Sequence, residues 1–69
     1  MQRYLVVIER AADNYSAYCP DLAGCVATGD TFDETEVAIH EALKLHLEGL
    51  AEDGLPIPAP AAHAEYIAV

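Results

Sequence analysis

Few side chains in this sequence have a spacing that supports chemistry. His40 and His46 are six residues apart, about 120° around a helix, whereas two histidines that share a metal ion on one helix are four apart. Cys19 and Cys25 could flank a tight turn, but no local signature of a nucleophilic cysteine surrounds either of them. We therefore predict no catalytic residue, no metal site and no cofactor.

The charge of the chain restricts its partners. Its 69 residues include 12 acidic and 3 basic side chains, giving a formal net charge of −9, while 54% are hydrophobic. Such a charge repels phosphate backbones and anionic lipid headgroups, which makes nucleic acid and a membrane surface poor partners and a basic protein a better one. The longest apolar run is far shorter than the ~20 residues of a membrane span. We expect one folded domain, residues 1–69, in the cytoplasm, with both cysteines reduced.

Three short strands are predicted in the first half of the chain. Residues 4–9 alternate in the strand period and carry apolar side chains on both faces, which favours a position in the middle of a sheet. A turn-forming Asp-Asn pair separates them from a second strand, residues 15–19, which ends at Pro20 because proline has no N–H for the ladder. Residues 25–28 form the third strand. The three strands should be antiparallel.

A helix is predicted from Thr31 to the stop signal of Asp53 and Gly54. Thr31 and Glu34 have the spacing of a capping box, in which the side chain of each residue accepts a hydrogen bond from the backbone N–H of the other residue. The helical face expected to cover the sheet consists of Phe32, Ile39, Leu43, Leu47 and Leu50, with Ala42 and His46 at its margin. The opposite face carries a row of acids that we name the acidic stripe: Glu34, Glu41, Glu48 and Glu52.

After the helix, residues 55–60 contain three prolines and predict a stiff, extended arm. Residues 65–69 are expected to form a last strand, parallel to its neighbour. The predicted fold is α+β with the order βββαβ, which is part of an RNase H-like unit. A metal-dependent nuclease of that descent would need clustered carboxylates. Glu9 and Asp30 are the residues to test for such an activity. The other acids lie on turns or on the outer face of the helix, so we expect no nuclease activity.

Several motifs resemble those of the HicB-like antitoxin family. They are YSAYCPDLAGC at residues 15–25, Gly29-Asp30-Thr31, the helix-capping Glu34, and Ile57, Pro58 and Pro60. The resemblance spans residue 4 to about residue 69. It implies a cytoplasmic antitoxin with a partial RNase H-like fold, assembled as a dimer or tetramer. It also implies a partner, a small basic HicA-type mRNA interferase toxin, whose active surface the antitoxin covers. Many family members append a DNA-binding domain, and we expect none within residues 1–69.

Four acids are the candidate contacts with such a partner. Asp21 and Asp30 are expected to be exposed at loop ends beside the sheet, where they can reach a partner without a cost in core packing, and Glu34 and Glu41 follow on the helix. An alternative function is a stand-alone oligomerising module without a toxin partner. Its subunit contact would be formed by Ala38, Leu45, Leu55 and Ile57.

Overall fold

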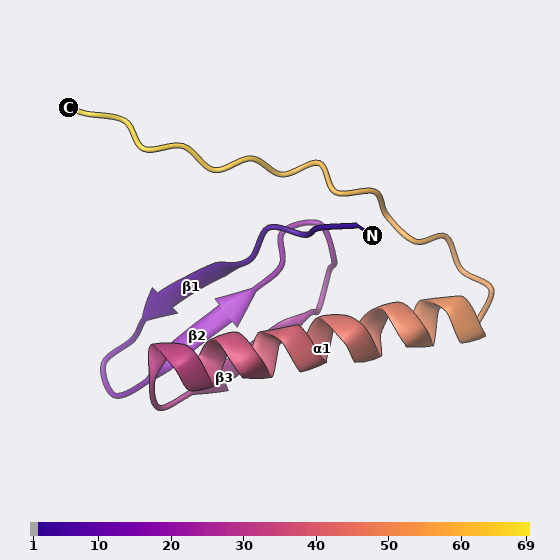
Figure 1. Cartoon of the computed structure of the whole chain (residues 1–69), viewed down its shortest axis with the longest axis horizontal. Coiled ribbons are helices and arrows are strands. Elements are labelled where there is room, and N and C mark those ends of the chain that lie inside the picture. Colours follow the sequence, from indigo (N-terminus) through magenta and orange to yellow (C-terminus); the bar gives the residue numbers. More distant parts are fainter. Residues whose placement is uncertain (1) are drawn as a thin grey trace.

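A computed structural model describes residues 2–69 and shows a three-stranded sheet covered by one helix (Figure 1). The strands are β1 (Val7–Arg10), β2 (Tyr15–Tyr18) and β3 (Val26–Gly29), and the helix is α1 (Phe32–Glu52). Both strand pairs are antiparallel and the order in the sheet is β1-β2-β3. The predicted α+β class, the three antiparallel strands and the helix are confirmed.

β1 differs from its prediction in length and in position. The ladder begins at Val7, which pairs with Tyr18, because the chain turns directly after β2 and the N–H of Leu22 donates to the carbonyl of Cys19 at 3.2 Å. Residues 4–6 therefore lie outside the ladder. β1 is also an edge strand, so the prediction that it lies in the middle of the sheet was wrong. The middle position requires a further strand beside β1.

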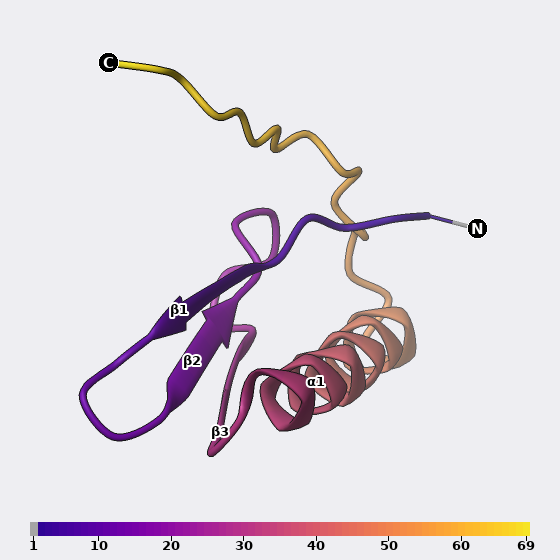
Figure 2. The ribbon, with the colours of Figure 1, turned by 60° about the vertical axis from the view of Figure 1, so that its left-hand side comes forward.

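That further strand, predicted at residues 65–69, is not formed. Residues 55–69 are neither helix nor strand, and the last part of the segment leads away from β1 in both Figure 1 and Figure 2. The hydrogen bonds that hold the arm to the body end at Ala62. Beyond that residue Tyr66 and Val69 are fully exposed. The order among the described residues is βββα, without the parallel strand of an RNase H-like unit.

Both ends of α1 follow the predicted local signals. Thr31 is the N-cap, and its hydroxyl accepts a hydrogen bond from the N–H of Glu34 at 3.1 Å. At the other end Gly54 has a φ of 67°, and the N–H groups of Gly54 and Leu55 donate to the carbonyls of Ala51 and Leu50. This pair of bonds is a Schellman motif, which requires a left-handed residue and thereby explains the glycine.

The core is small and includes one polar side chain that the sequence did not suggest. Its buried apolar residues are Ala17, Cys19, Leu22, Cys25 and Ile39. Thr35 is completely buried and donates from its hydroxyl to the carbonyl of Thr31 at 2.7 Å. Phe32, predicted for the covering face, is instead 48% exposed and lies edge-on against Tyr15 at 6.3 Å between ring centroids. It is the first residue of the helix and lies at the rim of the sheet.

Candidate binding surfaces

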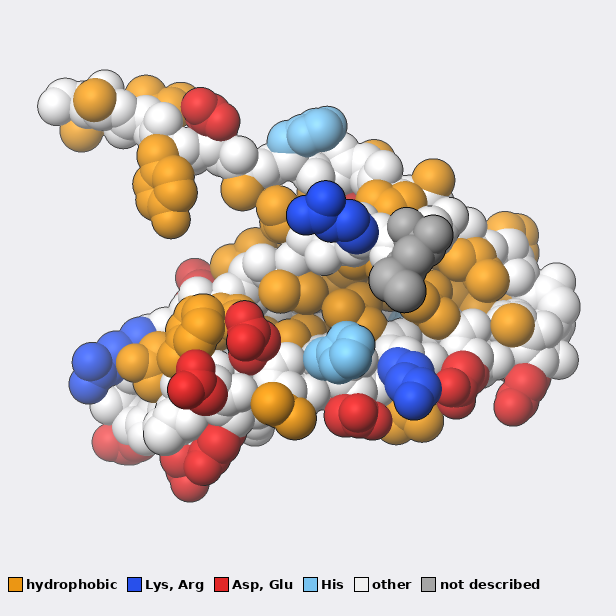
Figure 3. Space-filling view, viewed as in Figure 1, with side chains coloured by type: hydrophobic (Ala, Val, Ile, Leu, Met, Phe, Trp, Pro, Cys, Tyr) orange, Lys and Arg blue, Asp and Glu red, His pale blue; other side chains and the backbone are white. Residues whose placement is uncertain are grey.

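The acidic stripe lies on the exposed side of α1. Glu34, Glu41, Glu48 and Glu52 are all exposed. The space-filling view shows acidic side chains distributed along the edge of the molecule that the helix forms (Figure 3). The stripe follows from the apolar face of the helix, because the residues that cover the sheet leave the opposite side to solvent. Its position agrees with the sequence analysis.

Two of the four candidate contact residues meet at the start of α1. The N–H of Asp30 donates to the Glu34 carboxylate at 3.2 Å, one residue earlier than in the usual capping box. Both side chains are exposed. The first turn of the helix is acidic, and negative side chains at this position stabilise the helix because they lie at the positive end of its dipole. Glu41 extends this exposed acidic surface along the helix.

Asp21 lies away from the other candidates. It follows β2, whereas Asp30 follows β3, and the antiparallel pairing of these strands places the two residues at opposite ends of the sheet. The Asp21 carboxylate accepts hydrogen bonds from the N–H groups of Ala61 at 3.2 Å and Ala62 at 3.3 Å. Asp21 therefore holds the C-terminal arm, and the structure does not join the four candidates into one cluster.

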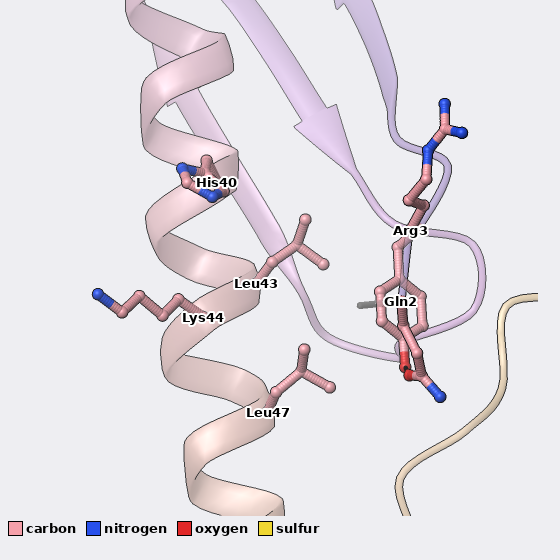
Figure 4. Close-up of a pocket in the computed structure, with 7 residues that line it drawn as sticks. Gln2, Arg3, His40, Leu43, Lys44 and Leu47 are labelled. Carbon is pink, nitrogen blue, oxygen red and sulfur yellow. Dashed lines mark hydrogen bonds between the residues drawn. The ribbon is translucent and has the colours of Figure 1, made fainter.

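An apolar groove, not foreseen from the sequence, lies between α1 and the segment before β1. Its volume is about 470 Å³, and its walls include Arg3 and Tyr4 on one side and His40, Leu43, Lys44 and Leu47 on the other. Figure 4 shows Leu43 and Leu47 pointing from the helix toward the N-terminal segment. We name this feature the helix groove.

The helix groove results from a mismatch in length. A helix of 21 residues is about 31 Å long, whereas a strand of four residues spans about 13 Å. The C-terminal half of α1 therefore extends beyond the sheet, and the helix packs mainly against β3 and least against β1. Leu43 and Leu47 remain only partly buried as a result. The ratio of predicted element lengths was the signal that could have revealed the groove.

The described residues 2–69 contain no group of three or more His, Cys, Asp or Glu side chains placed to hold a metal ion. Burial raises the pKa of the Cys25 thiol, and the nearby Cys19 raises it further, so this buried thiol is held in its protonated form. No helix in this part of the chain has the length and apolar character needed to cross a membrane.

Several known proteins are similar to this chain in sequence. A UPF0150 protein of Synechocystis sp. is 43% identical over 56 residues, which are 80% of this chain and 71% of the relative. A UPF0150 protein of Helicobacter pylori is 41% identical over 49 residues, 71% of this chain and 68% of the relative. An uncharacterised 14.9 kDa protein of Haemophilus phage HP1 is 36% identical over 93% of this chain, which spans about half (48%) of that relative.

A solved structure and a family model identify the group. A chain of the HicA3 and HicB3 toxin-antitoxin complex superposes with a TM-score of 0.73 and 32% identity, over 87% of this chain and 70% of that chain. The family described as the HicB_like antitoxin of bacterial toxin-antitoxin systems matches residues 4–69. The three-stranded sheet with its covering helix thus belongs to a protein of the HicB-like antitoxin family.

Proposed function

We propose that this protein is a cytoplasmic antitoxin that binds and masks a small, basic HicA-type mRNA interferase toxin and has no catalytic activity of its own. The membership of the family supports the antitoxin role. The structural neighbour is itself part of a HicA3 and HicB3 complex, which supports a toxin as partner.

The exposed acidic stripe is the observation that carries this proposal. From Glu34 to Glu52 it extends about 27 Å along α1, on a protein of net charge −9. This length suits one side of a protein interface of ordinary size, about 1,600 Å² in total. A surface of this kind attracts a cationic RNA-binding face and takes the place of the phosphates that the toxin would otherwise contact. Asp30, which lies beside Glu34, belongs to the same proposed interface.

Asp21 contributes to this function indirectly in our proposal. Its carboxylate is occupied by two backbone N–H groups of the arm, so its predicted contact with a partner would compete with these bonds. We therefore place the main contact surface on α1 and assign Asp21 the role of holding the arm.

A reversal of charge on the stripe tests the proposal. In Glu41→Lys/Glu48→Lys two exposed carboxylates at the centre of the stripe become ammonium groups, and in the matched control Glu9→Lys/Asp13→Lys the same change is made on exposed residues of β1 and its hairpin. Both variants change the net charge by the same amount. We expect the stripe variant to bind the proposed HicA-type toxin partner at least about tenfold more weakly, and the control to bind it within about threefold of the wild type.

The assay is titration calorimetry at two salt concentrations, with toxin-catalysed RNA cleavage as a second readout. Added salt should weaken binding by the wild type, because attraction between exposed charges is screened beyond ~8 Å at physiological ionic strength. Equal losses in the stripe variant and the control would show that only net charge matters. Full inhibition of the toxin by the stripe variant would contradict the assignment of the interface to α1.

A second candidate function, the oligomerising module, is supported by exposed apolar side chains. Leu45 on α1 is 65% exposed, and Leu55 and Ile57, which follow this helix, are 52% and 45% exposed. Ala38, also on α1, is half-buried. A sedimentation experiment that finds a stable oligomer and no affinity for any toxin would favour this function over the first.

A further inference from the structure

The two cysteines of the chain lie directly opposite each other where the pairing of β2 with β3 ends. Tyr18 pairs with Val26, so the next pair is Cys19 and Cys25. The N–H of Cys19 donates to the carbonyl of Cys25 at 3.1 Å, which confirms this register. Hydrogen-bonded antiparallel pairs have Cα atoms about 5.5 Å apart, close to the most common Cα separation in disulfides. The backbone thus places the two cysteines at a separation that a disulfide can bridge.

Both cysteine side chains belong to the core. Side chains alternate between the two faces of a strand, so Cys19 lies on the same face as Ala17, which is buried. Cys19 and Cys25 are each 3% exposed, and both are free thiols. The Cys19 thiol also contributes to the raised pKa of the Cys25 thiol, because two neighbouring groups that both become negative oppose each other's ionisation. The two sulfur atoms therefore share one small part of the core.

The loop between the two cysteines, residues 20–24, consists of two consecutive β-turns. The N–H of Leu22 donates to the carbonyl of Cys19, and the N–H of Cys25 donates to the carbonyl of Leu22, both at 3.2 Å. The second turn contains Gly24 with a φ of 81°, a conformation that favours glycine. Because the loop is short and closed by its own hydrogen bonds, it holds the two cysteines opposite each other without a covalent bond.

The same loop holds the C-terminal arm. Asp21 lies in the loop, and its carboxylate accepts hydrogen bonds from the N–H groups of Ala61 and Ala62 at 3.2 and 3.3 Å. In both views of the ribbon the loop lies on the side of the sheet that faces the C-terminal segment (Figures 1 and 2). A bond that restrains the loop therefore also restrains the carboxylate to which the arm is attached.

We propose that Cys19 and Cys25 form a reversible disulfide with a small-molecule disulfide such as oxidised glutathione as oxidant, and that this bond restrains the loop that holds the arm. One cysteine, as its thiolate, attacks the oxidant, forms a mixed disulfide and releases one glutathione. The second cysteine, also as its thiolate, attacks the protein sulfur of the mixed disulfide and releases the other glutathione. The two cysteines lose two protons and two electrons, which the oxidant gains as two thiols. Under reducing conditions both cysteines remain thiols.

The first test is the formation of the bond. Because both sulfur atoms are buried, the oxidant reaches them only when the loop opens locally, so the full chain is incubated with excess oxidised glutathione until the reaction is complete. Mass spectrometry should show a loss of about 2 Da that dithiothreitol reverses, and non-reducing peptide mapping should join Cys19 to Cys25 within one chain. The matched controls are Cys19→Ala and Cys25→Ala, which each keep one thiol and should show no such loss.

The second test is the effect on the arm. Hydrogen exchange at Ala61 and Ala62 should be at least about threefold slower in the oxidised wild type than in the reduced wild type, because the loop that carries Asp21 opens less often. The matched control is Asp21→Ala, in which the disulfide still forms but the two amides have no acceptor, so oxidation should leave their exchange unchanged. The urea midpoint of the wild type should rise by about 1 M on oxidation, because a closed loop lowers the entropy of the unfolded chain.

Two results would overturn the proposal. A wild type that gives only glutathione adducts or disulfides between chains would show that the two thiols of one chain do not meet. A bond within one chain that leaves exchange at Ala61 and Ala62 unchanged would show that the cysteine pair does not act on the arm. Both tests use the protein alone, so neither result bears on the antitoxin function, which is judged by the variants of the acidic stripe.

Discussion

Replacement of Gly29 by alanine should destabilise the protein through a single close approach. An alanine Cβ at this position would lie 2.6 Å from the Thr35 hydroxyl oxygen and 2.8 Å from the Thr35 backbone nitrogen. Thr35 is completely buried and its hydroxyl is hydrogen-bonded to Thr31, so neither the side chain nor the helix can move aside freely. The φ of Gly29 is not in the left-handed region, so the strain comes from the contact alone.

The expected net cost is about 1–2 kcal/mol. Insertion of a methyl group into a packed site costs roughly 1–3 kcal/mol, and the loss of unfolded-state entropy on Gly to Ala returns about 0.4–1 kcal/mol. A domain of this size has a stability of only about 3–5 kcal/mol, so this change removes roughly a third of it. In urea unfolding followed by helical circular dichroism, the midpoint should fall by about 1–2 M.

A second glycine provides the matched control. Gly49 lies in α1, and a Cβ placed on it meets nothing within 4 Å. Gly49→Ala should therefore raise the stability by about 0.5–1 kcal/mol, because alanine is the better helix former. In the double variant Gly29→Ala/Thr35→Ala the closest contact is absent, so the two changes should cost less together than their sum. A Gly29→Ala protein as stable as the wild type would refute this reasoning.

Two further predictions concern Asp21 and Cys25. Asp21→Ala removes the acceptor of two arm N–H groups, so hydrogen exchange at Ala61 and Ala62 should become faster while the core amides keep their protection; unchanged exchange at these two amides would show that the bonds do not hold the arm. The pKa of Cys25 is raised by burial, so its contribution to stability is complete below the unfolded-state value of about 8.5 and is lost as the pH rises through the folded-state pKa. Urea unfolding at pH about 7 and about 10 should show a larger loss for the wild type than for Cys25→Ala.

The parts of the fold that depend on neighbouring residues could be predicted from the sequence. Thr31 and Gly54 mark the ends of α1 because capping uses hydrogen bonds within a few residues. Pro20 marks the end of the second strand to within two residues for a similarly local reason. The three strands and the helix were therefore recognisable.

The parts that depend on distant segments could not be predicted in this way. Asp21 was a candidate contact because it looked exposed, but its partners, Ala61 and Ala62, are about 40 residues away in the sequence. Thr35 is buried only because Gly29 has no side chain where β3 meets α1. The helix groove depends on the overhang of one element past another, which is indicated only by the unequal lengths of the predicted elements. None of these relations leaves a periodic signal along the chain.

The short edges of the sheet limit uncontrolled self-association. β1 and β3 each have one unpaired side. An unpaired edge that is long and flat recruits further strands and leads to fibrils. Here each edge strand has only four residues, and β1 ends in the charged pair Glu9 and Arg10. Templated growth along the sheet is thereby discouraged in a protein of which more than half of the residues, 54%, are hydrophobic.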